Sequence, residues 1–209
     1  MGKLDQVRLL LFSGGIESTC LAAMHRPDLL VTIDYGHLAA TGEIAAAKQI
    51  AATLELDHTV LSAPLTEFGR GEMVGAHASN NDQVPEHWPL RNQMLVTLVA
   101  MKYADMGLTE IMIGTVASDC VHSDGTPDFI ARLNDLIGVQ TPGLRISAPA
   151  IGLSTRELVE ASGLAGDVLG WCFSCHRGSI ACGACRGCTK TLELLSSLAA
   201  DAKAKPVCN

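Results

Sequence analysis

The sequence predicts an α/β protein whose five-stranded parallel sheet is covered by helices on both faces. Short apolar runs of strand length alternate with longer segments of helical composition, which is the pattern of a parallel sheet with crossover helices. Apolar residues make up 48% of the 209 residues and charged residues 18%, which is enough apolar material for one sizeable core. Glycine and polar residues follow several apolar runs directly, where sheets of this class bind ligands.

Five short segments are predicted as strands because each is bounded by turn residues and alternates with a helical segment. They are Val7–Phe12, Leu29–Ile33, His58–Leu61, Glu110–Ile113 and Arg145–Ser147. The first run is too short to span a membrane, and no cleavage site of small residues follows it. A cytoplasmic protein without a membrane partner is therefore expected.

Helices are predicted where longer segments are rich in Ala, Leu and charged residues. They are Ser18–His25, Gly42–Leu54, Leu90–Met106, Thr126–Ile137, Ser154–Ser162 and Thr189–Leu198. Pro127 suits the first turn of its helix, and Ser154 with Glu157 makes a capping box. The segment Ser62–Pro89 contains several Gly and Pro residues and is predicted to be a long irregular loop, which in a compact domain is usually functional or disordered.

A hydroxyl- and glycine-rich string joins the first predicted strand to the first predicted helix. It reads Ser13-Gly14-Gly15-Ile16-Glu17-Ser18-Thr19. Gly14 and Gly15 let the backbone turn tightly and approach a ligand, and the helix that follows presents unpaired N–H groups to an anion. Ser13, Ser18 and Thr19 add hydroxyl donors. The string matches neither the Walker A nor the dinucleotide-binding pattern, but it has the composition of a phosphate-binding loop.

Five of the eight cysteines lie in one short segment, in spacings typical of zinc knuckles. They are Cys172, Cys175, Cys182, Cys185 and Cys188. Because a tetrahedral zinc takes four thiolates, the spacing allows a set that includes Cys172 or one that includes Cys188, and His176 is a further candidate. The remaining cysteines are expected to be ordinary thiols: Cys20, Cys120 and Cys208.

The formal net charge is −7 and no run of Lys or Arg occurs, so a small anionic substrate is favoured over direct binding of nucleic acid. Arg91 and Asn92 open a predicted helix and offer donors to such a substrate. His122 lies between Asp119 and Asp124, after the fourth predicted strand, where either acid could accept a hydrogen bond from the substrate. Three other histidines are expected to be ordinary loop residues: His37, His77 and His87.

Two motifs resemble known families. The string at residues 13–19 resembles the SGGxDS loop of the PP-loop ATP pyrophosphatases, with Glu17 in place of Asp. Ser174-Cys175-His176, followed by Cys182-Gly-x-Cys185-x-x-Cys188, resembles the SCY…CGxCxxC tail of the 7-cyano-7-deazaguanine synthases, the QueC family, with His176 in place of Tyr.

Three shorter motifs between these ends are similar to the same family. Pro89-Leu90-Arg91-Asn92 matches its P-x-R-N motif, and Asp34-Tyr35-Gly36 matches its DYG. Asp119 with the segment 124–129 resembles its DxSGYPDCRxEF stretch in part, because one residue fewer separates the acids and the GYP and CR are missing. The resemblance runs from about residue 7 to 198.

The resemblance implies an adenine nucleotide alpha hydrolase-like fold, which is Rossmann-like, with residues 1–165 as the ATP-binding domain, 166–200 as a zinc-binding segment with the last helix, and 201–209 as a tail. It assigns one structural zinc ion per chain to Cys175, Cys182, Cys185 and Cys188. ATP with Mg²⁺ is expected at Ser13, Gly14, Gly15, Ser18, Thr19, Asp34 and Tyr35. The substrate is expected at Arg91, Asn92, Asp119, His122 and Asp124, with Asp119 or Asp124 accepting hydrogen bonds from its guanine-like edge. The expected catalytic residues are Glu17, Arg91, Asp119 and Asp124.

The reaction that the resemblance implies uses 7-carboxy-7-deazaguanine, ammonia and two ATP. The carboxylate attacks the α-phosphate and gives an acyl adenylate, and ammonia displaces AMP to give an amide. A second adenylation on the amide oxygen, followed by loss of AMP, leaves the nitrile 7-cyano-7-deazaguanine (preQ0). A homodimer is expected.

Three other interpretations stay open. A QueC-like ligase of a modification or antiviral defence system would join the deazaguanine acyl group to another amine, such as a protein N-terminus. A catalytically degenerate PP-loop protein would serve as a binding module. An RNA-thiolating PP-loop enzyme would need a catalytic cysteine outside the zinc set, for which Cys120 is the candidate, and a basic surface, which the acidic balance disfavours.

Overall fold

A computed structural model describes residues 6–76, 85, 86 and 88–204, and it confirms the predicted α/β class. His77, His87 and Cys208 lie outside the described residues. One sheet has the strand order β3-β2-β1-β4-β5, and every neighbouring pair is parallel. The strands are β1 (Val7–Leu11), β2 (Leu29–Asp34), β3 (His58–Ser62), β4 (Leu108–Met112) and β5 (Arg145–Ser147).

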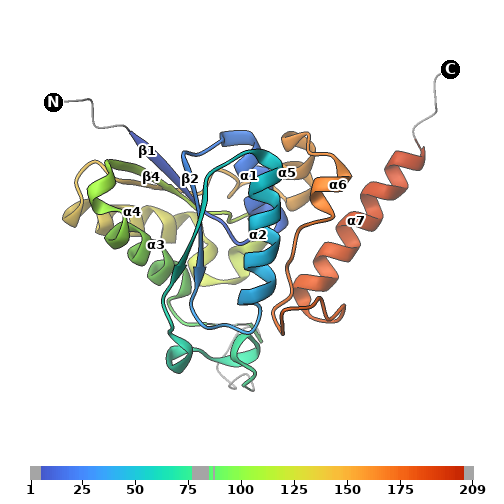
Figure 1. Ribbon diagram of the computed structural model, residues 1–209, viewed down its shortest axis with the longest axis horizontal. Coiled ribbons are helices and arrows are strands. Elements are labelled where there is room, and N and C mark those ends of the chain that lie inside the picture. Colours follow the sequence, from blue (N-terminus) through green and yellow to red (C-terminus); the bar gives the residue numbers. More distant parts are fainter. Residues whose placement is uncertain (1–5, 77–84, 87, 205–209) are drawn as a thin grey trace.

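Helices cover both faces of the sheet (Figure 1). Successive side chains of a strand face opposite sides, so in β1 Leu10 enters one core and Leu9 the other. The first face is covered by α1 (Ile16–His25), α2 (Ala40–Leu54) and α5 (Thr155–Ser162). The second face is covered by α3 (Arg91–Lys102) and α4 (Pro127–Gln140).

The strand order reverses beside β1. The chain passes from β1 through β2 to β3 on one side, and then crosses to β4 and β5 on the other side. The loop after β1 leads to α1 on the first face, whereas the segment after β4 leads to α4 on the second. Because these two connections leave the sheet in opposite directions, a crevice opens between them, which is where sheets of this kind bind ligands.

The C-terminal segment packs onto the first face. It contains α6 (Gly166–Leu169) and α7 (Arg186–Ala204), and Leu169 and Leu194 belong to the same core as Leu10. The single turn α6 was not predicted because four residues carry too little periodicity to signal a helix. α7 begins earlier and ends later than the predicted helix, so it starts inside the cysteine segment and includes residues that were predicted as tail.

Helix α3 is shorter than the predicted helix Leu90–Met106 at both ends. Leu90 has a left-handed backbone, with a φ of 60°, and therefore precedes the helix as its N-cap. At the other end, Ala104–Met106 forms a 3-10 turn that Gly107 ends with a φ of 69°. Composition alone missed both breaks because Leu, Ala and Met all favour helices.

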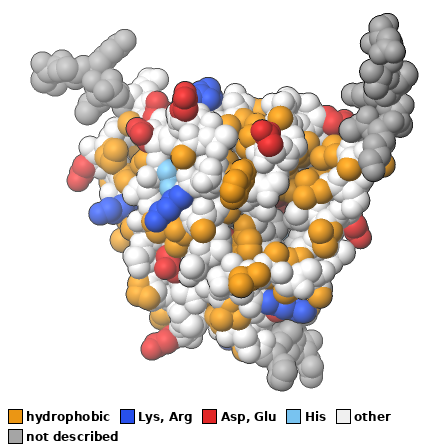
Figure 2. Space-filling view, turned by 45° about the vertical axis from the view of Figure 1, so that its right-hand side comes forward, with side chains coloured by type: hydrophobic (Ala, Val, Ile, Leu, Met, Phe, Trp, Pro, Cys, Tyr) orange, Lys and Arg blue, Asp and Glu red, His pale blue; other side chains and the backbone are white. Residues whose placement is uncertain are grey.

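The irregular segments contain short 3-10 turns. They lie at Thr66–Phe68 and Gly71–Val74 in the long loop, and at Ala117–Val121 and Ser123–Gly125 after β4. Figure 2 shows that the Lys and Arg side chains on one face are few and lie apart among acidic ones, so the described part of this face has no continuous basic surface. No helix within the described residues is both long and apolar enough to cross a membrane.

Candidate active site

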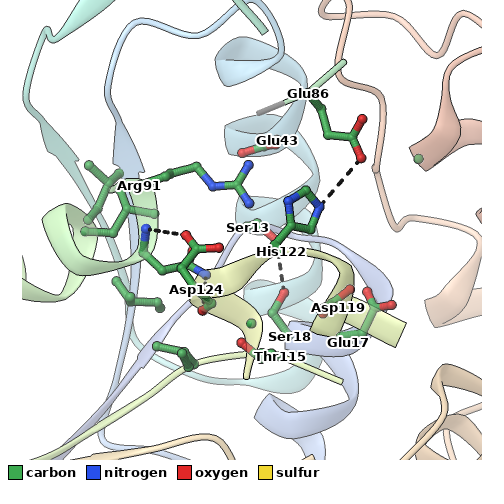
Figure 3. A pocket seen from close by; sticks show the side chains of 18 of the residues that line it. Ser13, Glu17, Ser18, Glu43, Glu86, Arg91, Thr115, Asp119, His122 and Asp124 are labelled. Atoms are coloured by element: carbon green, nitrogen blue, oxygen red, sulfur yellow. Dashed lines mark hydrogen bonds and ion pairs between the residues drawn. The ribbon is translucent and has the colours of Figure 1, made fainter. Parts of the chain in front are cut away.

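A pocket with a volume of about 320 Å³ lies at the carboxyl ends of β1, β2 and β4, at the reversal in strand order. Its walls come from the loop after β1, the long loop with the first turn of α3, the turns after β4, and the start of α7. Figure 3 shows side chains from several of these segments pointing into the same space. The predicted site residues that line it are Ser13, Glu17, Ser18, Tyr35, Arg91, Asn92, Asp119, His122 and Asp124.

The loop after β1 has the geometry of an anion-binding loop. Gly14 has a φ of 74°, and a Cβ there would lie 2.7 Å from the backbone nitrogen of Ala47, so glycine is required. Gly15 is the N-cap of α1 and offers no side-chain cap, which leaves N–H groups of the first turn available to an anion. The Ser18 hydroxyl donates to the Gly15 carbonyl at 3.1 Å and lies 3.4 Å from the Ser13 hydroxyl.

Two of the residues predicted to contact ATP do not line the pocket, and their side chains make hydrogen bonds within the protein instead. Thr19 is fully buried, and its hydroxyl accepts a hydrogen bond from the Cys172 thiol at 3.5 Å. Burial raises the pKa of that thiol to about 11, so it stays protonated and can donate. The Asp34 carboxylate accepts the backbone N–H of Gly36 at 3.0 Å and thereby fixes the turn after β2.

Glu17 is bound by two residues from distant parts of the chain. The Thr155 hydroxyl donates to its carboxylate at 2.8 Å, and the Lys190 ammonium lies 2.7 Å from the same oxygen. Lys190 also lies 3.9 Å from Asp119. This lysine therefore sits between two of the predicted catalytic carboxylates. Its role could not be predicted from the sequence, because it lies on the last helix, at the opposite end of the chain from Glu17.

The other predicted acids take part in internal hydrogen bonds. Asp119 accepts the backbone N–H of Val116 at 3.0 Å and so closes the turn after β4. Asp124 accepts the backbone N–H of Asn92 at 3.3 Å, and the Asn92 side-chain amide donates to the Asp124 carbonyl at 3.1 Å. These bonds join the start of α3 to the turns after β4, which fixes two walls of the pocket relative to each other.

Arg91 and Tyr35 form a further wall. The Tyr35 ring stacks on the His37 ring with centroids 3.9 Å apart. Burial raises the pKa of the Tyr35 hydroxyl, and the neighbouring Arg91 offsets this only in part, so the hydroxyl stays protonated. His37 was expected to be an ordinary loop residue, but it is buried and its ring nitrogen lies 3.0 Å from the Glu43 carboxylate.

Glu86 is a buried carboxylate in the pocket wall that sequence analysis did not single out. Its side chain is only 5% exposed, and its Oε1 lies 2.8 Å from the Arg186 guanidinium and 3.7 Å from His122. Burial raises the pKa of the Glu86 carboxyl, but the nearby His122 side chain, together with hydrogen bonds from the backbone and Arg186, outweighs burial and lowers the pKa to about 2. The carboxyl is therefore ionised at neutral pH. Its position in the long irregular loop was the only signal in the sequence.

Four thiols lie close enough together to bind one metal ion. The Sγ atoms of Cys175, Cys182, Cys185 and Cys188 are all within 4.8 Å of one another, and two of the pairs are 3.9 and 4.0 Å apart. Tetrahedral zinc, with Zn–S bonds of about 2.3 Å, separates its sulfurs by roughly 3.8 Å. Cys172 lies outside this group and bonds to Thr19.

Backbone N–H groups donate to sulfurs of this cluster and favour the thiolate form of Cys182, whereas burial raises the pKa of the Cys188 thiol. The N–H of Cys185 donates to the Cys182 sulfur at 3.3 Å, and the N–H of Cys188 donates to the Cys185 sulfur at 3.4 Å. Such bonds from Ala184 and Cys185 lower the pKa of the Cys182 thiol to about 6. The local structure thus fits a metal site.

The cysteine segment is joined directly to the anion-binding loop. The backbone N–H of Phe173 donates to the Gly14 carbonyl at 2.9 Å. α7 begins between the last two cysteines of the cluster, and Arg186 and Lys190 lie one helical turn apart on it, both lining the pocket. The four-cysteine cluster and the pocket are therefore joined to each other through α7 and through the loop after β1.

A 3-2-1-4-5 parallel sheet with a glycine- and serine-rich anion loop at the reversal of strand order defines an α/β protein of the PP-loop fold. The solved structure of the U34-tRNA thiolase NcsA from Methanococcus maripaludis with its [4Fe-4S] cluster is similar, with a TM-score of 0.50. The match covers 97% of this chain and 67% of that chain. At 14% identity the likeness concerns the fold alone.

Within this class, the chain belongs to the QueC family. The family model described as Queuosine biosynthesis protein QueC matches residues 7–198. A 7-cyano-7-deazaguanine synthase from Thiobacillus denitrificans is 31% identical over 205 residues, covering 86% of this chain and 89% of the relative. The synthase from Methanothermobacter thermautotrophicus is 27% identical over 201 residues, covering 86% and 90%. The resemblance inferred from the motifs is thereby confirmed.

Proposed function

We propose that this chain is an ATP-dependent carbon–nitrogen ligase that adenylates 7-carboxy-7-deazaguanine and converts it into the nitrile 7-cyano-7-deazaguanine. The observation that carries the proposal is that the anion-binding loop and Arg91 face the same pocket in a chain of the QueC family. Relatives that match most of the chain are named for this product.

The loop after β1 would hold the phosphates of ATP. The free N–H groups at the start of α1 and the hydroxyls of Ser13 and Ser18 are the donors, and Lys190 offsets negative charge nearby. Glu17 and Asp119 already share one ammonium group, so they suit Mg²⁺, which typically takes one or two carboxylates together with phosphate oxygens. When bound, this ion neutralises the charge of the departing pyrophosphate.

The proposed reaction needs no nucleophile from the protein. A carboxylate oxygen of the substrate bonds to the α-phosphorus of ATP as the bond to the β-phosphate breaks and pyrophosphate leaves. Ammonia then attacks the acyl carbon, AMP leaves and a proton is lost, which gives the amide. The amide oxygen then bonds to the α-phosphorus of a second ATP as pyrophosphate leaves and a proton is lost, and loss of AMP and a second proton leaves the nitrile. Arg91 would orient the carboxylate, and positioning supplies most of the rate.

The four-cysteine cluster is proposed to hold zinc in a structural role, because four thiolates leave no open coordination position. Zinc would fix the start of α7 and hence the helix that carries Arg186 and Lys190 into the pocket. Binding energy at such a site contributes directly to folding of the segment.

Mass spectrometry of the products tests the proposal. Incubation with 7-carboxy-7-deazaguanine, ATP, Mg²⁺ and ammonium should yield the nitrile, AMP and pyrophosphate. Arg91→Ala should lower the yield about 100-fold, whereas Arg132→Ala, which removes an exposed arginine of α4 that pairs with Asp128 and does not line the pocket, should leave it unchanged. An amide as the final product, or a conjugate with an added peptide amine, would support the alternative ligase. The absence of any deazaguanine product would contradict both.

A further inference from the structure

We propose that Glu86 selects a guanine-type ring by accepting a hydrogen bond from the exocyclic 2-amino group of the substrate at its free carboxylate oxygen. The inference rests on the proposed function and deepens it, because it names the residue that sets specificity for the ring. It differs from the expectation that Asp119 or Asp124 accepts hydrogen bonds from the guanine-like edge of the substrate.

Glu86 has an unused acceptor oxygen inside the pocket. Its side chain is 95% buried and lines the pocket, and its Oε2 is buried without a hydrogen-bond partner among the residues that the structure describes. Leaving a buried carboxylate oxygen unpaired costs free energy, and a ligand that donates an N–H to it removes this cost. The site is therefore built to receive a donor.

The surroundings of Glu86 favour a donor without charge. The Arg186 guanidinium, 2.8 Å away, and His122, 3.7 Å away, already lie against the other oxygen of Glu86. Because the negative charge has a partner, a neutral N–H suits the free oxygen better than a second full cation such as ammonium. With a pKa of about 2, the carboxyl accepts hydrogen bonds and does not donate them, which matches an amino group.

Asp119 and Asp124, by contrast, already accept hydrogen bonds from other groups of the protein. Asp124 accepts the backbone N–H of Asn92, and Asp119 accepts that of Val116 while its other oxygen lies near Lys190. Asp119 is thereby placed at the phosphate end of the pocket, because Lys190 is paired with Glu17 of the anion-binding loop.

The position of Glu86 in the pocket also suits the 2-amino group. The carboxyl group of 7-carboxy-7-deazaguanine is on the five-membered ring and has to reach the phosphates, whereas the 2-amino group projects from the opposite end of the bicycle. In Figure 3, Glu86 lies on one side of the pocket and Ser18 and Glu17 lie on the other, with His122 between them. A ring that spans this pocket brings its amino group toward Glu86 and its carboxyl toward the loop.

Calorimetry with two ligands tests the inference. In the presence of a non-hydrolysable ATP analogue, the wild-type chain should bind 7-carboxy-7-deazaguanine about 10- to 100-fold more tightly than the analogue that lacks the 2-amino group, since one charge-assisted hydrogen bond is lost. Glu86→Gln should weaken binding of the guanine-type ligand and change binding of the other ligand little, so that most of the discrimination disappears.

Glu72→Gln is the matched control. Glu72 belongs to the same long loop and pairs with Arg177 of the cysteine segment, as Glu86 pairs with Arg186, but it does not line the pocket. This variant should keep the full discrimination. Metal content and affinity for the ATP analogue, unchanged in both variants, show that each has folded.

The outcomes separate this inference from the proposed function. Equal binding of the two ligands by the wild-type chain overturns the role of Glu86 without any variant, while the proposed function stands. Discrimination that survives in Glu86→Gln likewise overturns the role of Glu86 in selecting the ring. A raised KM for ammonium in that variant would then assign Glu86 to the amine instead. Binding of neither ligand by the wild-type chain overturns both.

Discussion

At position 15 the anion-binding loop has room for a glycine but little room for a larger side chain. A Cβ there would lie 3.2 Å from the Ser13 hydroxyl oxygen and 3.7 Å from that of Ser174, while the φ of −78° is open to any residue. Gly15→Val should therefore fold but place methyl groups in the space for the phosphates. We expect release of pyrophosphate to fall by about 100-fold or more, because small displacements of reacting groups have effects of this size.

The control for this variant is Gly138→Val, since a Cβ at Gly138 meets no atom within 4 Å. Gly138→Val should release pyrophosphate at the wild-type rate, and circular dichroism should show that both variants are folded. Undiminished release from Gly15→Val would remove the loop after β1 from the ATP site.

The Glu86 carboxyl predicts a dependence of stability on pH. Its pKa in the folded chain, about 2, is lower than the unfolded value of 4.5. The stability that it contributes is thus fully present above pH 4.5 and is lost as the pH falls toward 2. Between these limits the wild-type chain should lose stability relative to Glu86→Gln, by roughly 1–2 kcal/mol after allowance for screening by water.

Urea unfolding of both proteins at a series of pH values measures this difference. Release of metal at low pH is common to the two proteins, so the difference between them isolates Glu86. Parallel loss of stability in both proteins would mean that Glu86 is not held ionised by Arg186 and His122.

Among the elements, α7 depends on the cysteine cluster at its start. Cys182→Ser and Cys188→Ser should each lose zinc and reduce the helical signal, because binding energy at such sites is folding energy. Cys172→Ser should keep zinc, since this thiol lies outside the cluster and bonds to Thr19. Metal analysis of the three variants decides the ligand set. Loss of zinc from Cys172→Ser together with its retention in Cys188→Ser would show that the assigned set is wrong.

The same helix predicts a link between metal and nucleotide. Because α7 carries Lys190 to Glu17 and the cysteine segment bonds to Gly14, removal of the metal should weaken binding of an ATP analogue by about 10-fold or more. Calorimetry before and after treatment with a chelator, with readdition of zinc as the control, measures the effect. An affinity for the analogue that is unchanged by chelation would separate the two sites.

At the scale of the whole molecule, the sequence was sufficient for the parts that depend on local pattern. Strands such as Leu29–Asp34 and the capped helix Thr155–Ser162 follow from short apolar runs and capping residues. The anion-binding loop was predictable because its members lie close together in the chain. The spacing of the cysteines left two sets open, and the family resemblance chose the set whose thiols lie together. The family, which residues 7–198 match, follows from those motifs.

The residues that could not be predicted are those whose role depends on contacts across the fold. Lys190 reaches Glu17 only because α7 packs back onto the first face of the sheet. Glu86 acquires its partner Arg186 only because the long loop meets the start of α7. No spacing in the sequence indicates either of these contacts. Each charged residue therefore looked like an ordinary surface residue of a loop or helix.

The proposed adenylation can be tested most directly with isotope-labelled substrate. If 7-carboxy-7-deazaguanine carries ¹⁸O in both carboxylate oxygens, each adenylation transfers one labelled oxygen to AMP. Mass spectrometry of the wild-type reaction should find two AMP molecules per nitrile, each with one ¹⁸O. One labelled AMP per amide, with no nitrile, would show that the reaction stops at the first stage. Unlabelled AMP, or no AMP at all, would contradict adenylation of the carboxylate and with it the proposed function.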